Sequence, residues 1–162
     1  MNASWQQVDV IVMDGWIQAG SNITGTITSF GAANDEVTVK LMQGSTEIAS
    51  TVTTDGTYKL TSVAPGTYSL VVSKLNHATR TYEITVASED IIQDVKIHLL
   101  GDINGDGRLN ARDVNRANAH VKKTSTLTGY EMACADINAD GRINARDVNR
   151  MNAHVKKTAL LW

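Results

Sequence analysis

Residues 101–124 read GDINGDGRLNARDVNRANAHVKKT, and residues 135–158 read ADINADGRINARDVNRMNAHVKKT. The second stretch repeats the first with a period of 34 residues, and only four of the 24 positions differ. A similar period occurs in helical solenoids, but two copies are too few for a solenoid, and the Asp, Asn and Gly content is typical of loops. The repeat therefore predicts a duplicated unit in which a polar loop precedes a helix.

Each copy opens with oxygen-bearing side chains at the spacing of a 12-residue calcium loop. Calcium takes about six to eight oxygen ligands, and a glycine at the sixth position allows the sharp turn, as Gly107 and Gly141 do here. The expected ligands, with main-chain carbonyls from the two arginines, are Asp102, Asn104, Asp106, Arg108, Asn110, Asp113, and Asp136, Asn138, Asp140, Arg142, Asn144, Asp147. We expect two calcium ions, one in each loop. Magnesium fits less well because it prefers rigid octahedral geometry, and an Asx-rich turn without metal is the alternative.

An amphipathic helix follows each loop. Apolar residues recur at intervals of three and four, at Val114, Ala117 and Val121 and again at Val148, Met151 and Val155. These side chains are expected in the core. Between the copies, Thr128 and Glu131 have the spacing of a capping box, which predicts a short helix over about 129–134. The chain ends on three apolar residues, Leu160-Leu161-Trp162, and this cluster is expected to pack on something, because termini otherwise fray.

Two features separate the repeat from an EF-hand. The last loop position is Asp113 or Asp147, where an EF-hand has Glu, and a strand-like run, residues 95–99, enters the first loop where an EF-hand has a helix. A duplicated calcium loop with only an exiting helix resembles the dockerin family. The resemblance implies an α-helical dockerin over 100–162 with two EF-hand-like calcium loops.

The resemblance to dockerins also implies a partner, a location and a binding face. Dockerins bind cohesin modules of scaffold or cell-surface anchoring proteins, and they assemble cellulosomes or amylosomes, the secreted polysaccharide-degrading complexes of anaerobic bacteria. An extracellular or cell-surface location and a monomer are therefore expected. The partner-binding face is expected to comprise Ala111, Arg112, Asn115, Arg116, Asn118, Ala119, Lys122, Lys123, and Ala145, Arg146, Asn149, Arg150, Asn152, Ala153, Lys156, Lys157. In many cellulosomal dockerins, two residues with hydroxyl side chains follow the ninth loop position. Here Ala111-Arg112 and Ala145-Arg146 stand there, which implies a different cohesin specificity.

The first hundred residues have the alternation and turn signals of short β-strands. Val37-Thr38-Val39-Lys40-Leu41 places three apolar side chains on one face, and Gly- and Pro-containing turns separate such runs. Short strands at this spacing predict an antiparallel sandwich. The expected strands are Val8–Met13, Asn22–Thr28, Val37–Leu41, Glu47–Thr53, Thr57–Leu60, Thr67–Val72, Thr81–Val86 and Ile92–Leu99.

Residues 22–87 of this half resemble the carboxypeptidase-regulatory-like family. The similarity lies in a GTI strand at Gly25, a DGTY hairpin at Asp55 and a PGTY hairpin at Pro65. It implies an Ig-like β-sandwich over 8–99, of the kind called an X module when it precedes a dockerin. Residues 1–7 are expected to be a tag or linker. The apolar joint Leu99-Leu100-Gly101 is too short for a free hinge, so we expect the X module to pack on the dockerin and stabilise it.

Composition and motifs argue against several other classes. The net charge is −2, aromatic residues are scarce, and charge is split between −5 in residues 1–100 and +3 in residues 101–162, which favours two modules and disfavours nucleic-acid binding. No apolar run is long enough for a membrane span, and the start lacks the pattern of a signal peptide. No nucleophile elbow, zinc-protease motif or P-loop is present, so we expect no enzyme. The single cysteine, Cys134, excludes an internal disulfide and is expected to be buried.

Two other functions remain possible readings of the same residues. A calcium sensor would have a glutamate at the last loop position and a Met-rich groove, whereas the loop-exit helices contain only Met151. A carbohydrate-binding module with a dockerin appended would need a planar row of exposed aromatic residues, for which only Trp5, Trp16 and scattered tyrosines are available. Zinc binding by His120 and His154 lacks supporting ligands.

Overall fold

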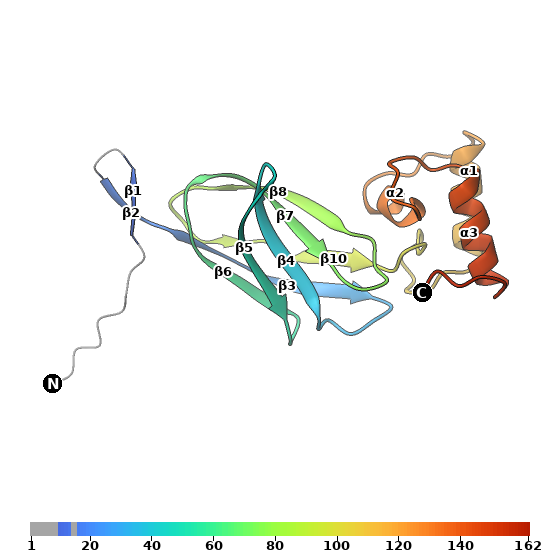
Figure 1. The fold of residues 1–162 in the computed structure, drawn as a ribbon, viewed down its shortest axis with the longest axis horizontal. Helices are drawn as coiled ribbons and strands as arrows, with labels where there is room; N and C mark the ends of the chain where they lie inside the picture. Colours follow the sequence, from blue (N-terminus) through green and yellow to red (C-terminus); the bar gives the residue numbers. More distant parts are fainter. Residues whose placement is uncertain (1–9, 14–15) are drawn as a thin grey trace.

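The structure is a computed structural model, and it describes residues 10–13 and 16–162. A strand-rich half and a helical half lie end to end, with the helices at the end farthest from the N-terminus (Figure 1). The expected tag or linker, residues 1–7, lies outside the described residues, as does the start of the first expected strand. In the described part of the chain, none of the helices has the length and apolar content to cross a membrane.

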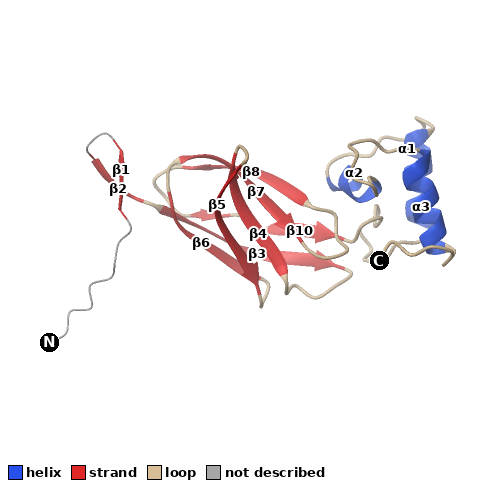
Figure 2. Cartoon of the chain, viewed as in Figure 1, coloured by secondary structure: helices blue, strands red, loops and turns tan. Residues whose placement is uncertain are grey.

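The strand-rich half contains a hairpin and two four-stranded sheets (Figure 2). Strands β1 and β2 pair with each other, β10, β3 and β6 form one sheet with β9 added along β3, and β5, β4, β7 and β8 form the other in that order. The strands are β1 Val10–Met13, β2 Trp16–Ala19, β3 Ser21–Phe30, β4 Val37–Gln43, β5 Thr46–Thr53, β6 Thr57–Val63, β7 Gly66–Ser73, β8 Arg80–Val86, β9 Ile91–Ile92 and β10 Val95–His98.

Alternating side chains from both sheets fill the core of this half. In β4, every second residue from Val37 to Leu41 is buried, as the sequence pattern predicts, and none of the three is exposed to solvent. The largest fully buried side chains of this core, Ile23, Leu41, Leu70 and Ile97, come from strands of both sheets. The expected β-sandwich is therefore present, and β2 is a strand that the sequence did not indicate.

The strand directions differ from the expected antiparallel arrangement. Strand β10 runs parallel to β3, with Val95 opposite Ile27, and β9 is also parallel to β3. The expected single strand Ile92–Leu99 is interrupted after Ile92, because the Asp94 carboxylate accepts the N–H and the hydroxyl hydrogen of Thr26, both at 2.8 Å. The parallel pairing arises because the chain crosses from β8 in one sheet to the outer side of β3 in the other.

The helical half has three helices, α1 Ala111–Val121, α2 Tyr130–Ala135 and α3 Ala145–Val155. Asn110 and Asn144 cap α1 and α3, each within a capping box completed by an aspartate at the third helical position. Helix α2 departs from the expected cap: Gly129, with φ 54°, is its N-cap, and the Thr128 side chain makes no capping bond. Only one of the two hydrogen bonds of the expected capping box forms: the Glu131 carboxylate accepts the Thr128 N–H at 3.1 Å.

The predicted core positions of the helices are filled as expected. Ala117 and Met151 occupy the same position in the two copies, and this is the largest difference in side-chain size between them. Both are fully buried in one core, where a small side chain and a large one pack together. Val114 and Val148 are buried beside them. Cys134 is buried too, and burial raises the pKa of its thiol to about 12.

The two halves are joined by a continuous contact. Ala78, in the loop before β8, is buried in the core of the helical half. The Leu100 N–H donates to the Asn76 carbonyl of the sandwich at 2.9 Å, and the Gly101 N–H donates to the Cys134 carbonyl of α2 at 2.8 Å. These bonds and the buried Ala78 side chain hold the halves together, in agreement with the expected packing of the two modules.

An aromatic stack crosses the same joint. The buried His98 ring lies between Phe30 at 4.3 Å and Tyr130 at 4.0 Å, with nearly parallel planes to both. Arg80 lies 5.8 Å from the centre of the Tyr130 ring. Because Phe30 and His98 end their strands and Tyr130 begins α2, the stack fixes the short helix on the end of the sandwich.

The first polar loop also rests on this end of the sandwich. Gly31 has φ 84°, and a β-carbon there would meet the Leu99 side chain and lie 2.7 Å from the Gly107 carbonyl oxygen. Only glycine lets the two backbones approach this closely. The position of the first loop is therefore set by the sandwich as well as by its own residues.

Replacing Gly31 by alanine is expected to destabilise the joint more than the same change at Gly44. Both glycines have positive φ, at 84° and 61°, but a β-carbon at Gly44 meets nothing within 4 Å. Gly44→Ala should cost about 1–2 kcal/mol from backbone strain alone, and Gly31→Ala should cost more because Leu99 and Gly107 must also move. Thermal unfolding of the two variants measures the difference; equal losses would mean that the close approach contributes nothing.

Acidification is expected to weaken the joint through His98. Burial, followed by the nearby charge of Arg80, lowers the pKa of His98 from 6.5 to about 4. Between these values the unfolded chain binds a proton that the folded chain does not, so stability falls as pH falls, by at most about 1.4 kcal/mol per pH unit. Denaturant unfolding between pH 7 and pH 4 should show this loss, and His98→Phe, which keeps the stack, should reduce it; an unchanged slope would contradict the assignment.

Candidate functional site

The first loop is organised by two buried aspartates, Asp102 and Asp113, neither of which is exposed to solvent. The Asp102 carboxylate accepts the N–H groups of Gly105, Asp106 and Gly107 at 2.8–3.1 Å. The Asp113 carboxylate accepts those of Ile103, Asn104 and Asn110 at 2.9–3.0 Å. The first and last expected ligands therefore curl the loop around themselves.

The remaining side chains of the first loop converge on Asp106. Its Oδ2 accepts hydrogen bonds from the Asn104 amide at 3.0 Å and the Asn110 amide at 3.3 Å. The Asn104 hydrogen bond is the main reason that the pKa of Asp106 is lowered. The ligands expected at loop positions 3, 5 and 9 are thus neighbours in space, although they are separated in sequence.

The second loop repeats this arrangement in a more open setting. Asp147 is fully buried and accepts the Ile137 and Asn144 N–H groups at 3.0 and 2.9 Å, while the Asn138 amide donates to Asp140 at 2.8 Å. Asp136, the counterpart of Asp102, is only half-buried. The second loop thus keeps most of the internal hydrogen bonds of the first. Within the described residues, it has no counterpart of the bonds from the Asn104 and Gly105 N–H groups or from the Asn110 amide.

The Gly105/Ala139 difference between the loops follows from their surroundings. A β-carbon at Gly105 would lie 3.2 Å from the Tyr130 hydroxyl oxygen and 3.5 Å from the His98 ring. The second loop has no such neighbour at Ala139, which is exposed and tolerates a φ of 56°. A side chain at Gly105 would therefore be tight against the Tyr130 hydroxyl, whereas Ala139 is exposed.

The donors of each loop fit a hard cation such as calcium. In the described residues, neither Asp102 nor Asp113 has a basic partner, and burial, with the nearby charge of Asp113 also contributing, raises the pKa of Asp102. No group of three or more His, Cys, Asp or Glu side chains is arranged as a metal site within the described ranges. A complete donor set therefore needs the asparagine and main-chain oxygens as well, and this mixture is what calcium takes.

The expected partner-binding residues lie on the two longer helices and in the turns that end them, where the four lysines are found. Most are exposed, whereas Arg116, Asn118, Ala119, Asn152 and Ala153 are half-buried. Helices α1 and α3 lie beside each other, with α2 between this pair and the sandwich (Figures 1 and 2). The two faces are therefore located at the end of the molecule away from the sandwich.

The duplication extends beyond the stretch that the sequence comparison revealed. The Leu127 N–H donates to His120 Nδ1 at 3.1 Å, and the Leu161 N–H donates to His154 Nδ1 at the same distance. Leu127 is buried and Leu161 is half-buried in the helical core. Sequence reasoning missed this equivalence because few of the residues around the two leucines are identical, although the paired histidines were a signal.

The tail after α3 packs as expected only in part. Leu161 joins the core, and the Trp162 ring lies 4.5 Å from that of His154, although Trp162 is still 40% exposed. Leu160, at 67% exposure, does not pack. Within this chain, the expected packing is therefore seen for Leu161 and in part for Trp162, and not for Leu160.

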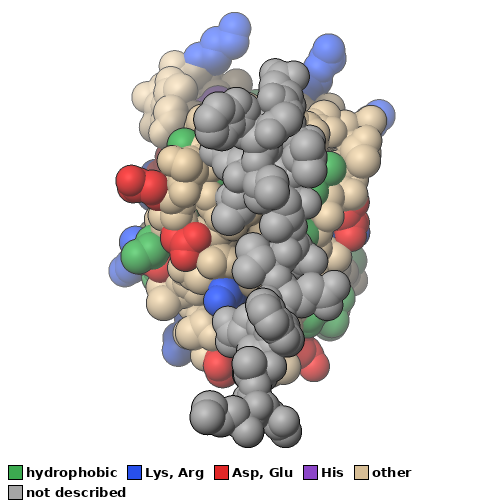
Figure 3. All heavy atoms as spheres, turned by 90° about the vertical axis from the view of Figure 1, so that its left-hand side faces the viewer, with side chains coloured by type: hydrophobic (Ala, Val, Ile, Leu, Met, Phe, Trp, Pro, Cys, Tyr) green, Lys and Arg blue, Asp and Glu red, His purple; other side chains and the backbone are tan. Residues whose placement is uncertain are grey.

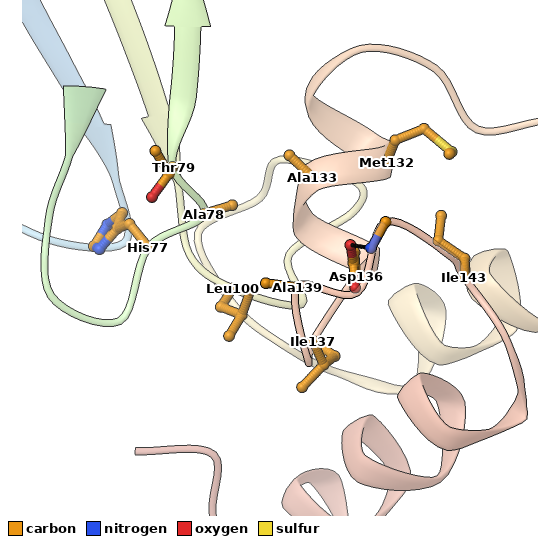
Figure 4. A pocket seen from close by; sticks show the side chains of 11 residues that line it. His77, Ala78, Thr79, Leu100, Met132, Ala133, Asp136, Ile137, Ala139 and Ile143 are labelled. Carbon is orange, nitrogen blue, oxygen red and sulfur yellow. Dashed lines mark hydrogen bonds between the residues drawn. The ribbon is translucent and has the colours of Figure 1, made fainter. Parts of the chain in front are cut away.

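A cavity of about 460 Å³ lies beside the second loop, between the sandwich end and α2 (Figure 4). Its lining is mainly apolar, from residues such as Ala78, Leu100, Met132 and Ile137, with Asp136 at one side. Asp136 accepts the Gly141 N–H at 2.8 Å within the loop. The cavity therefore belongs to the joint and to the second loop.

Two family models match the chain, one for each half. Residues 100–156 match the dockerin type I domain, and residues 22–100 match the carboxypeptidase regulatory-like domain. The chain is a carboxypeptidase regulatory-like domain followed by a dockerin. Both resemblances drawn from the sequence are thus confirmed, and together the matches span residues 22–156.

Solved structures with similar folds include two interface mutants of a type II cohesin–X–dockerin complex from Acetivibrio cellulolyticus. The N-terminal interface mutant is 22% identical and the C-terminal interface mutant 21%, and each match covers 83% of this chain and 95% of that chain with a TM-score of 0.45. A putative carbohydrate binding protein from Bacteroides uniformis is 20% identical, with 49% of this chain and 42% of that chain covered and a TM-score of 0.37. No curated protein matches the chain.

Removal of calcium is expected to destabilise the dockerin half. The carboxylates of each loop lie close together, and none of them has an ion-pair partner among the described residues. A small helical core with no disulfide is only marginally stable. Calcium that binds only the folded state should add about 2.7 kcal/mol per site at a hundredfold excess over its dissociation constant. A chelator should therefore lower the melting temperature.

The matched variants are Asp136→Asn, in the second loop, and Asp55→Asn, in an exposed turn of the sandwich. The first should lose part of the calcium-dependent increase in melting temperature, and the second should keep all of it. Circular dichroism and melting that are unchanged by the chelator would contradict calcium binding by these loops.

Proposed function

We propose that the dockerin half binds a cohesin in a calcium-dependent manner and that the chain thereby anchors a protein in an extracellular polysaccharide-degrading complex. The observation that carries the proposal is the duplicated loop and helix, with an all-oxygen donor set in each loop, inside the region that matches the dockerin family. The partner is a cohesin of a scaffold or cell-surface anchoring protein. No catalytic role is proposed.

The loops hold the helices in position for docking. The donors proposed to hold the two ions are those expected from the sequence, from Asp102 to Asp113 and from Asp136 to Asp147. Bound calcium supplies positive charge that offsets the repulsion between the carboxylates of each loop. Asp113 and Asp147 also belong to the capping boxes of α1 and α3, so a stable loop fixes the start of each helix.

The exposed helix faces are suited to an acidic partner surface. Each carries two arginines and two lysines, while the loop carboxylates point inward to their own backbone. Opposite charges across an interface mainly raise the association rate and set specificity. We propose that the cohesin surface is acidic at its rim.

The sandwich is proposed to act as an X module that stabilises the dockerin. The Gly31–Gly107 approach and the Phe30–His98–Tyr130 stack support this role, because both link the sandwich to the first loop or to α2. The helix faces remain open on the opposite side. The sandwich thus supports the docking domain without covering the proposed face.

A calcium-sensor function has less support. A sensor exposes a methionine-lined groove when calcium binds, but Met151 is fully buried between the helices. A sugar-binding role for the sandwich also gains little support from the residues that the structure describes, since Tyr58 and Tyr68 are buried and their hydroxyls bond main-chain carbonyls. On the end of the molecule shown in Figure 3, the visible hydrophobic side chains form small separate groups. Trp5 lies outside the described residues.

A cohesin panel tests the proposed function. The full chain should retain at least one cohesin in calcium and release it in chelator, whereas Asp102→Asn combined with Asp136→Asn should abolish retention in calcium. Lys59→Ala, an exposed change on β6, is the control and should bind normally. Failure to retain any cohesin from the source organism would overturn the proposal.

Docking is expected in two orientations related by the internal repeat. Rotation by 180° places Arg146 and Asn149 where Arg112 and Asn115 were, and these residues are identical between the copies. Replacing either pair by alanine should leave binding within about tenfold of normal, or about 1.4 kcal/mol. Replacing all four should abolish it. Calorimetric titration measures the affinities, and loss of binding from one pair alone would indicate a single orientation.

A further inference from the structure

The two proposed docking faces have the same sequence but different neighbours. Arg116 on α1 forms an ion pair with Glu131 of α2. Arg150 occupies the same position on α3, is exposed, and has no ion-pair partner among the residues that the structure describes. Through Glu131, α2 thus gives the α1 face an ion pair that the α3 face lacks among the described residues.

Glu131 is held beside Arg116 by several contacts. Its second carboxylate oxygen accepts the Thr128 N–H at 3.1 Å, and its side chain is only 17% exposed. The adjacent Tyr130 is stacked on His98, which fixes the start of α2 on the sandwich. Glu131 is therefore a fixed negative charge beside the α1 face.

The Arg116 side chain is nevertheless within reach of a partner. It is 42% exposed, and it lies one helical turn after Arg112, on the exposed side of α1. A partner carboxylate that approaches Arg116 must compete with Glu131 and is also repelled by it. At Arg150 the described structure offers neither competition nor repulsion.

We propose that Glu131 makes the α3 face the preferred docking face for an acidic partner surface. This inference rests on the proposed cohesin-docking function and makes its two orientations unequal. The sandwich contributes indirectly, because the stack of Phe30, His98 and Tyr130 holds α2, and hence Glu131, next to α1.

The test uses full-length variants that can dock through one face only. Arg146→Ala with Asn149→Ala leaves the α1 face, and Arg112→Ala with Asn115→Ala leaves the α3 face. Affinity is measured in calcium for a cohesin retained in the panel. The α3-face variant should bind like the unmodified chain, and the α1-face variant should bind about fivefold more weakly.

Glu131→Gln is then added to each single-face variant. Glutamine removes the charge but can still accept the Thr128 N–H, so α2 keeps its cap. The change should raise the affinity of the α1-face variant to that of the α3-face variant and leave the α3-face variant unchanged. Lys59→Ala, on the sandwich, should alter neither.

The outcomes separate the inference from the function on which it rests. Equal affinities of the two single-face variants, or an equal effect of Glu131→Gln on both, would overturn the inference and leave cohesin docking intact. Binding by neither the variants nor the unmodified chain would overturn both. A second comparison applies if Glu131→Gln lowers the melting temperature in calcium. Arg150→Ala is then made in the α3-face variant and Arg116→Ala in the α1-face variant. Arg150→Ala must weaken binding more than Arg116→Ala, or the inference fails.

Discussion

The Asp113 carboxylate connects the two ends of the first loop to the start of α1. One oxygen accepts the N–H groups of Ile103 and Asn104, and the other accepts that of Asn110, the residue that caps the helix. Asp147 makes the equivalent bonds to Ile137 and Asn144. Both carboxylates are fully buried, and burial of a charge is costly unless it is compensated. A cation in each loop would supply that compensation, so the same residue links metal binding, loop shape and helix orientation.

The sandwich makes the two copies of an almost identical repeat unequal. The first loop rests on Gly31, and the aromatic stack lies close to Gly105, whereas the second loop lies beside a cavity and carries Ala139. Helix α2, which lies between the two copies of the repeat, is fixed by the same stack and places Glu131 beside α1. Contacts outside the proposed docking surface thus change the charge of the α1 face and leave the α3 face as the repeat defines it.

Much of the fold and the candidate site could be predicted because the patterns are local. Alternation in Val37–Leu41 locates a half-buried strand, and the spacing from Asp102 to Asp113 locates a loop, since each depends on neighbours within a few residues. The parallel pairing of β10 with β3 depends on a crossover between sheets, which no local pattern records. The Arg116–Glu131 pair and the close approach of Gly31 to Gly107 likewise depend on how separate elements meet. The spacing of Thr128 and Glu131 correctly predicted the short helix α2 but gave Thr128 as its N-cap. The N-cap is Gly129, which adopts a positive φ.

The number of calcium ions bound by the metal-free full chain tests the central claim most directly. Calorimetric titration of calcium is expected to show two ions per chain. Asp102→Asn should remove the first-loop site and leave one ion, Asp136→Asn should remove the second-loop site and leave one ion, and Asp55→Asn, outside both loops, should leave two. Binding of no calcium by the unmodified chain, or a stoichiometry that neither loop variant reduces, would contradict the assignment of these loops as the element that organises the docking domain.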